Sequence, residues 1–180
     1  LQNKINQASE NATITLDKAY TESITIPEGK TITLDLNGQT LINEEGKHTI
    51  TNEGTLTIVG TGTVDNVSHG KGAVYNDAGA TCTILGGNYT RSQENGQSDS
   101  DSGGNSWYAI KNFGTMTIGE EGAPNDAVKV SFTGKYSSLV ANGWQDGAAA
   151  GQPNKEPAYE RDAQLTIHSG TFTGGINTIK

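Results

Sequence analysis

The sequence predicts an all-β fold, a parallel β-solenoid in which one continuous chain winds through stacked coils. Two observations support this prediction: similar segments recur along the chain, and each contains short runs of alternating apolar and polar residues separated by Asn and Gly. Neighbouring residues of a strand point to opposite faces. Self-similarity at a period of roughly 20–50 residues is typical of repeat architectures.

The repeat is clearest in residues 49–58 (Thr-Ile-Thr-Asn-Glu-Gly-Thr-Leu-Thr-Ile), which residues 109–118 echo (Ala-Ile-Lys-Asn-Phe-Gly-Thr-Met-Thr-Ile). A third copy, 73–84, carries a short insertion, and a fourth is split into 139–143 and 164–167. A further short strand follows each copy, giving three strands to a coil. A β-sandwich would also contain many short strands. It would not require corresponding strands to repeat their sequence in register.

The spacing of the copies predicts the length of a coil. Corresponding positions are separated by 24, 24, 36 and 30 residues. They are Ile26, Ile50, Val74, Ile110 and Val140. An earlier, looser copy also places Leu34 at the offset of Ile58. We therefore expect about 24 residues per coil, with insertions where the interval is longer.

Residues 1–10 are predicted to form a short capping helix. Leu1, Ile5 and Ala8 are spaced i, i+4, i+7, which is the apolar stripe of an amphipathic helix. An uncovered terminal coil exposes unpaired strand edges, so we expect this helix to lie over the first coil. Residues 174–180 resemble the start of another coil. We therefore expect a single β-helix domain, 1–180, that is part of a longer protein.

The middle strand of each coil supplies the predicted core. Its inward side chains should form columns: Leu56 and Ile58, Cys82 and Ile84, Met116 and Ile118, Leu165 and Ile167. Cys82 is thus predicted to be a small buried hydrophobe, not a nucleophile. One cysteine excludes an intramolecular disulfide and a Cys-based zinc site.

Four asparagines share one position of the repeat: Asn52, Asn76, Asn112 and Asn142. Asn tolerates the left-handed conformation that a sharp turn needs. Stacked Asn side chains can also hydrogen-bond along the axis, as in Asn ladders of stacked sheets. We therefore assign these residues a structural role.

Threonines flank the inward residues of the middle strand and should form two outward columns. They are Thr31 and Thr33, Thr55 and Thr57, Thr81 and Thr83, Thr115 and Thr117, and Thr166. Thr is favourable on a solvated strand. Because some antifreeze solenoids carry similar arrays, ice binding is one alternative function.

Composition excludes some partners. The 20 acidic residues exceed the 12 basic ones, giving a net charge of −8, so nucleic acid is not expected. No apolar run approaches the ~18–20 residues that span a membrane, and no signal peptide is visible.

No metal or cofactor is expected from the sequence. His48, His69 and His168 lack a His-x-x-x-His spacing and are predicted to lie on the surface. Asp99 and Asp101 resemble the start of a calcium loop, but Ile110 occupies the twelfth position, where an acidic residue is needed. The prediction there is a polar loop.

Three phrases resemble a known group of proteins. They are Ala12-Thr13-Ile14-Thr15-Leu16, Thr31-Ile32-Thr33-Leu34-Asp35-Leu36-Asn37-Gly38, and the recurring Asn-x-Gly-Thr-Leu-Thr-Ile units. These resemble right-handed parallel β-helix segments, of the pectin-lyase-like superfold, in large surface proteins of Gram-positive bacteria. The resemblance implies a right-handed coil and an extracellular, secreted or wall-attached location. That group includes adhesins, immunoglobulin-binding proteins and polysaccharide-active enzymes, so fold alone does not decide function.

The sequence lacks a recognisable catalytic constellation. Glycosidic hydrolysis generally needs two carboxyl groups roughly 5–10 Å apart, and the chain has no Asp-Asp pair; residues 68–72 resemble only part of a polygalacturonase-like pattern. Arg91 and Arg161, the two arginines, lie in or beside insertions instead of on strands. We therefore predict a non-enzymatic module, with a polysaccharide lyase or hydrolase as the alternative.

Three insertions interrupt the repeat: 91–106, 119–127 and 143–163. Loops on a rigid scaffold often carry function, and aromatic residues with a polar edge are favoured in interfaces. The candidate ligand-binding residues are Arg91, Trp107, Tyr108, Trp144, Tyr159 and Arg161. Alternatively, Trp107 and Trp144 hold their own loops in place, and strand parity points Tyr108 inward.

The expected partner is a host protein, immunoglobulin first, or a surface glycan. The isolated module is expected to be a monomer. A passive spacer is a further alternative.

Overall fold

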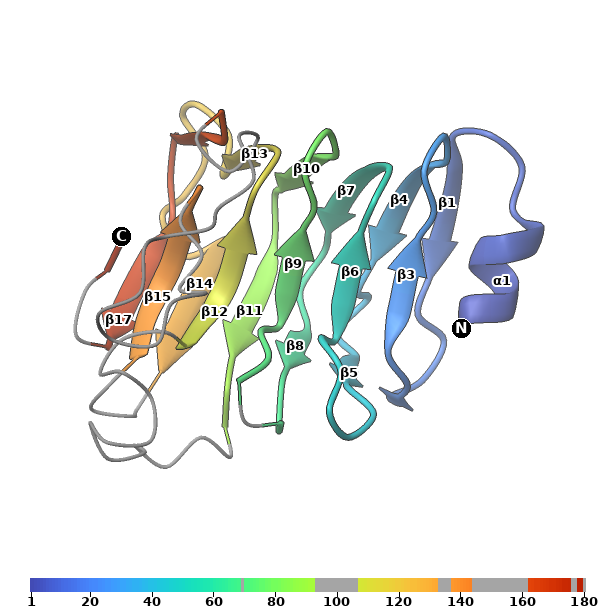
Figure 1. Cartoon of the computed structure of the whole chain (residues 1–180), viewed down its shortest axis with the longest axis horizontal. Helices are drawn as coiled ribbons and strands as arrows, with labels where there is room; N and C mark the ends of the chain where they lie inside the picture. Colours follow the sequence, from blue (N-terminus) through green and yellow to red (C-terminus); the bar gives the residue numbers. More distant parts are fainter. Residues whose placement is uncertain (69, 93–106, 133–136, 144–161, 176–177, 180) are drawn as a thin grey trace, which may run out of the picture.

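The chain forms a right-handed parallel β-helix of three stacked sheets in a computed structural model (Figure 1). The structure describes residues 1–68, 70–92, 107–132, 137–143, 162–175 and 178–179. Within these, each strand pairs in parallel with the strand three places along the chain. Successive strands therefore pass from sheet A to B to C and back to A, which is the predicted three-strand coil.

Sheets A and B have six strands each, and sheet C has five. Sheet A contains β1 (Ala12–Thr15), β4 (Thr31–Asp35), β7 (Thr55–Val59), β10 (Thr81–Ile84), β13 (Thr115–Ile118) and β16 (Gln164–Ile167). Sheet B contains β2 (Tyr20–Thr21), β5 (Thr40–Ile42), β8 (Thr63–Asp65), β11 (Gly87–Thr90), β14 (Val128–Phe132) and β17 (Thr171–Gly174). Sheet C contains β3 (Ile24–Ile26), β6 (Ile50–Asn52), β9 (Val74–Asn76), β12 (Trp107–Asn112) and β15 (Ser137–Asn142).

The predicted inward columns form the core. The side chains of Leu56, Ile58, Cys82, Ile84, Met116 and Ile118 are buried. Leu165 and Ile167 are only partly buried, because β16 lies at the outer edge of sheet A. Burial raises the pKa of the Cys82 thiol to about 12, which keeps it protonated and unreactive, as predicted.

The register of the first coil differs from the prediction. Ile24, not Ile26, lies opposite Ile50 in sheet C, while Leu34 lies opposite Ile58 in sheet A as expected. The turn between β3 and β4, residues 27–30, is two residues longer than the turn 53–54 of the next coil. An extra pair of residues leaves the inward–outward alternation unchanged. The sequence pattern therefore gave no sign of the shift.

The four asparagines form a continuous ladder. Nδ2 of Asn52 donates to Oδ1 of Asn76 at 2.7 Å, Asn76 donates to Asn112 at 2.8 Å, and Asn112 donates to Asn142 at 2.7 Å. The ladder confirms the structural role. The prediction of a left-handed backbone conformation for these asparagines was wrong, because among the described non-glycine residues only Asn11 and Asn37 have positive φ. The ladder residues end strands of sheet C, and their amides point inward.

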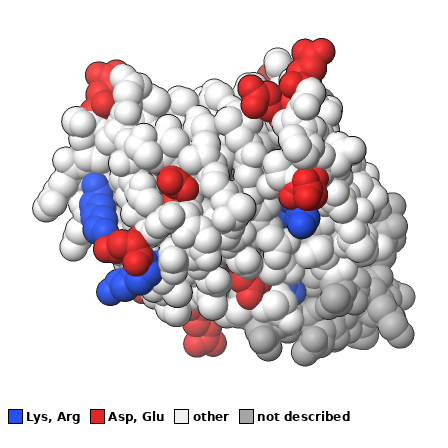
Figure 2. Space-filling view, turned by 180° about the vertical axis from the view of Figure 1, so that it is seen from behind, with Lys and Arg blue, Asp and Glu red and all other residues white. Residues whose placement is uncertain are grey.

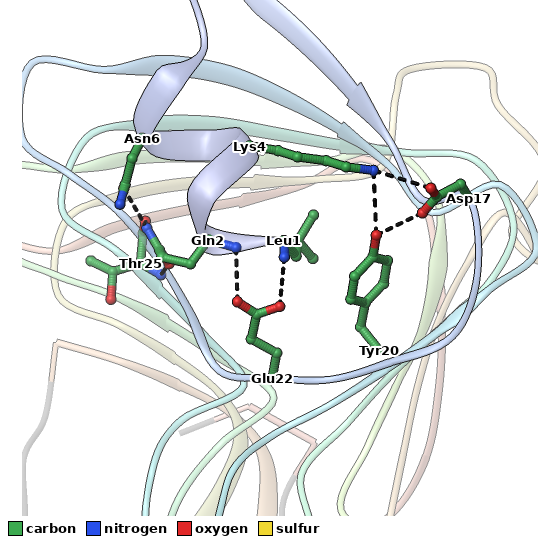
Figure 3. Close-up of polar contacts among 8 residues, drawn as sticks. All are labelled: Leu1, Gln2, Lys4, Asn6, Asp17, Tyr20, Glu22 and Thr25. Atoms are coloured by element: carbon green, nitrogen blue, oxygen red, sulfur yellow. Dashed lines mark hydrogen bonds and ion pairs between the residues drawn. The ribbon is translucent and has the colours of Figure 1, made fainter.

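Helix α1 (Gln2–Gln7) lies at the N-terminal end of the solenoid, and its Ile5 is buried (Figure 1). The Gln2 side chain forms hydrogen bonds to β3 that the backbone of a neighbouring strand would otherwise form (Figure 3). Its Nε2 donates to the Thr25 carbonyl at 2.9 Å, and its Oε1 accepts from the Thr25 N–H at 2.7 Å. Edge strand β3 thereby has backbone groups satisfied that an uncovered edge would expose.

Two acidic side chains hold the helix to the first coil (Figure 3). Glu22 accepts from the Leu1 amino group at 2.6 Å and from the Gln2 N–H at 2.9 Å. Asp17 accepts from the Tyr20 hydroxyl at 2.6 Å and from Lys4 Nζ at 3.2 Å. The Tyr20 hydrogen bond, followed by that of Lys4, lowers the pKa of Asp17 to about 2.

Candidate functional site

Most of the predicted site residues lie outside the described residues or in the protein interior. Trp144, Tyr159 and Arg161, and the weak metal candidates Asp99 and Asp101, are outside the described residues. Trp107 is the first residue of β12, as the boundary of the insertion 91–106 predicted.

Arg91 and Tyr108 are both buried near the junctions of that insertion. The Arg91 guanidinium carbon lies 5.5 Å from the centre of the Phe132 ring. Tyr108 is buried, and Lys111 Nζ lies 5.4 Å from its ring centre. In this structure these two side chains pack the scaffold and do not offer an exposed contact surface.

The two longest insertions are attached to strands of the same sheet. Insertion 91–106 leads into β12, and insertion 143–163 leaves β15. These two strands pair side by side in sheet C. One junction lies at the start of a sheet C strand and the other at the end, a separation of roughly 20 Å for a strand of this length. The outer side of sheet C faces the viewer in Figure 1.

An open groove of about 490 Å³ lies on the outer side of sheet C. Its lining combines residues from α1, β3 and β6 with the segments that enter β6 and β9: Gln2, Ser23, Ile24, Thr25, Gly46, Lys47, His48, Thr51 and Lys71. The groove thus contains two lysines, one histidine and several hydroxyl groups, and none of the described residues that line it is acidic. We call this the sheet C groove.

His48 is held in a defined position within the sheet C groove. Its Nδ1 accepts a hydrogen bond from the Gly72 N–H at 2.9 Å, so in the neutral ring the proton is on Nε2. The imidazole stacks on Tyr75, with ring centres 4.7 Å apart, and Tyr75 lies 5.3 Å from Phe113. This row of rings crosses three coils and fixes the orientation of His48.

Burial lowers the pKa of His48 to about 4, assisted by the positive charges of Lys111 and Lys71. At neutral pH the ring is therefore an uncharged donor beside ammonium groups. The prediction of a surface histidine was wrong for His48, which is half-buried. It was correct for His168, which is exposed, whereas His69 lies outside the described residues.

The opposite margin of sheet C has the opposite charge. Glu28, Glu53 and Asp77, from the turns that follow β3, β6 and β9, line a smaller cleft of about 280 Å³. Lys47 and Lys71 thus lie before strands β6 and β9, and Glu53 and Asp77 lie after them. On the side of the molecule facing away in Figure 1, charged side chains are few and scattered (Figure 2).

The sequence contained a signal for both clusters. Lys47 and Lys71 are 24 residues apart, as are Glu53 and Asp77, so the predicted coil length places each pair on neighbouring coils. Sequence reasoning used this interval only for apolar and Asn positions. It therefore missed the alignment of the charged residues.

Across the part of the chain that the structure describes, no three His, Cys, Asp or Glu side chains are grouped so as to hold a metal ion. No helix among those residues is long and apolar enough to cross a membrane. Comparisons with protein families, with curated proteins and with solved structures found no match.

Proposed function

We propose that this chain is a non-catalytic binding module of an extracellular bacterial protein, secreted or attached to the cell wall. In this proposal the β-helix is a rigid scaffold that presents insertions 91–106 and 143–163 to a macromolecular partner. The partner is a host protein, with immunoglobulin the first to test, or a surface glycan. The module acts as a monomer.

The observation that carries the proposal is that the two longest insertions are attached to paired strands of one sheet: 91–106 leads into β12, and 143–163 leaves β15. Between the junctions, the scaffold is fixed by the Asn ladder and the strand register. Loops mounted on such a scaffold lose little conformational freedom relative to each other on binding.

The test is a pull-down from host secretions and a glycan array, run with the intact chain and with a variant that lacks residues 144–162. We expect the deletion to abolish capture, as should the double substitution Trp144→Ala and Tyr159→Ala. The β-sheet circular dichroism should not change. A matched control shortens insertion 119–127, which lies between sheets A and B and should not affect capture.

Two outcomes would overturn the proposal. Undiminished capture by the deletion variant would remove the insertions from the binding surface. Cleavage of polygalacturonate or a related polysaccharide by the intact chain would favour the alternative function, a lyase or hydrolase.

A further inference from the structure

The sheet C groove contains polar groups without partners among the described residues. Lys71 forms no ion pair within the described part of the chain, and Nε2 of His48 donates to no acceptor there. The hydroxyls of Thr25 and Thr51 likewise make no hydrogen bond to a described residue. Lys47 is partly neutralised by Glu44, at 2.6 Å. The groove therefore offers donors that a ligand could satisfy.

The charge of the groove is unusual for this protein. The chain carries a net charge of −8, yet the described residues that line the groove include Lys47, His48 and Lys71 and no carboxylate. The row formed by Tyr75 and Phe113 holds His48 in place before any ligand arrives. A preorganised neutral donor next to ammonium groups favours a ligand that carries a negative charge and hydroxyl groups.

We infer that the sheet C groove binds an acidic carbohydrate, with the carboxylate or sulfate of the sugar near Lys71 and its hydroxyls at His48, Thr25 and Thr51. This inference deepens the proposed function and rests on it, because it names the glycan class that a binding module of this shape would take. It places the primary contact on the scaffold itself.

The lining of the groove favours a sugar over an acidic peptide. Peptide recognition generally relies on anchoring side chains buried in apolar pockets. Among the described residues of the groove, Ile24 is the only large apolar one, and it is already buried in the core. A volume of about 490 Å³ lies within the usual range for small-ligand sites, roughly 300–1,000 Å³. Because the groove is open, a longer glycan chain could continue beyond it.

The experiment compares two probes that differ by one acidic sugar, 3′-sialyllactose and lactose. Titration of the intact chain by isothermal calorimetry should show binding of 3′-sialyllactose that weakens as salt is raised, and much weaker binding of lactose. Lys71→Gln should weaken the binding of 3′-sialyllactose roughly tenfold, since it removes a charge-assisted contact. Lys71→Arg should restore most of it.

The matched control is Lys129→Gln, which removes the same charge from the exposed face of β14 in sheet B. It should leave binding unchanged. Equal binding of both sugars, or equal loss in both variants, would overturn the inference. So would binding of inorganic sulfate as tight as that of 3′-sialyllactose, or tighter binding of an oligoglutamate peptide at the same residues.

The two proposals can fail separately. If Lys71→Gln has no effect while deletion of residues 144–162 abolishes capture, the groove inference is wrong and the proposed function stands. If the groove binds the acidic sugar and the deletion has no effect on capture, the module binds through its scaffold and the role given to the insertions is wrong.

Discussion

Sheets A and C belong to the same coils but differ in what they show to solvent. In sheet A the outward positions repeat from coil to coil, and Thr33, Thr57, Thr83 and Thr117 align in register as predicted. In sheet C Thr25 and Thr51 are alike, but the aligned outward positions Thr51, Tyr75 and Lys111 differ from one another. The inward positions of the inner coils are mostly apolar or Asn and are buried in both sheets.

The comparison separates two kinds of constraint. Inward residues must fit the column above and below them, so both sheets repeat there. Outward residues do not have to fit such a column. The Thr residues of sheet A are of a type that is favourable on the solvent-exposed face of a strand. The departure from the repeat in sheet C coincides with the groove, the ring row and both long insertions. The differing outward residues therefore mark the candidate functional surface.

The largest expected effect comes from breaking the buried ladder below sheet C. Asn76→Ala removes one donor and one acceptor at a fully buried position, between Asn52 and Asn112. Because each buried polar group left without a partner costs ~1–3 kcal/mol, we expect a loss of about 3 kcal/mol in the free energy of unfolding. Urea denaturation followed by circular dichroism measures this loss. A loss below about 1 kcal/mol would show that the ladder contributes little.

A somewhat smaller loss is expected for Gly114→Ala, in the turn between β12 and β13. An added Cβ would lie 2.2 Å from the Ala80 carbonyl oxygen and 2.5 Å from that of Asp77, in the coil below. Overpacking typically costs ~1–3 kcal/mol, and we expect about 2 kcal/mol by the same denaturation measurement. If stability is unchanged, the turn at residues 77–80 can move aside and the coils are less tightly stacked than described.

The pH dependence of stability tests the environment of His48. Its pKa is about 4 in the folded protein and 6.5 in the absence of burial, so between these values the unfolded chain binds more protons. Stability should therefore fall as the pH falls from about 6.5 towards 4, by on the order of 2 kcal/mol from this group. His48→Gln can still accept from Gly72 but does not titrate. Denaturation midpoints at pH 7 and 5 should differ less in this variant, and an equal difference would place His48 in solvent.

The smallest effect is expected on the outer side of sheet A. Thr83→Ser keeps the hydroxyl in a solvated column, away from the groove and the insertions. We expect a change within ~0.5 kcal/mol and unchanged binding of 3′-sialyllactose. A loss of binding in this variant would show that sheet A contributes to recognition and would remove the contrast between the two sheets.

The fold could be predicted because stacking forces the sequence to repeat. The interval between Asn52 and Asn76 gave the coil length, and the alternation around Leu56 and Ile58 gave the core. The register of Ile24 could not be predicted, since two extra turn residues leave the alternation intact. The ladder asparagines end strands with their amides pointing inward and do not adopt a left-handed turn. Their position in the repeat alone could not distinguish these two arrangements.

The candidate site could be predicted from the sequence less well than the fold, for a physical reason. A repeat constrains the residues that stack, whereas the position of a non-repeating residue such as His48 depends on neighbours from other coils. Its hydrogen bond from Gly72 and its contact with Tyr75 join segments 24 and 27 residues away. Trp144 and Tyr159 are predicted from residue type alone, and both lie outside the described residues.

A pair of engineered cysteines tests the stacking of the coils most directly. Thr57 and Thr83 are register partners on the outer side of sheet A, and adjacent parallel strands are ~4.8 Å apart, within the Cα range of a disulfide. In a Cys82→Ala background, Thr57→Cys with Thr83→Cys should oxidise to an intramolecular disulfide. Thr57→Cys with Thr117→Cys, two strands apart, should not. Efficient oxidation of the second pair and not the first would contradict the in-register coils on which the whole account depends.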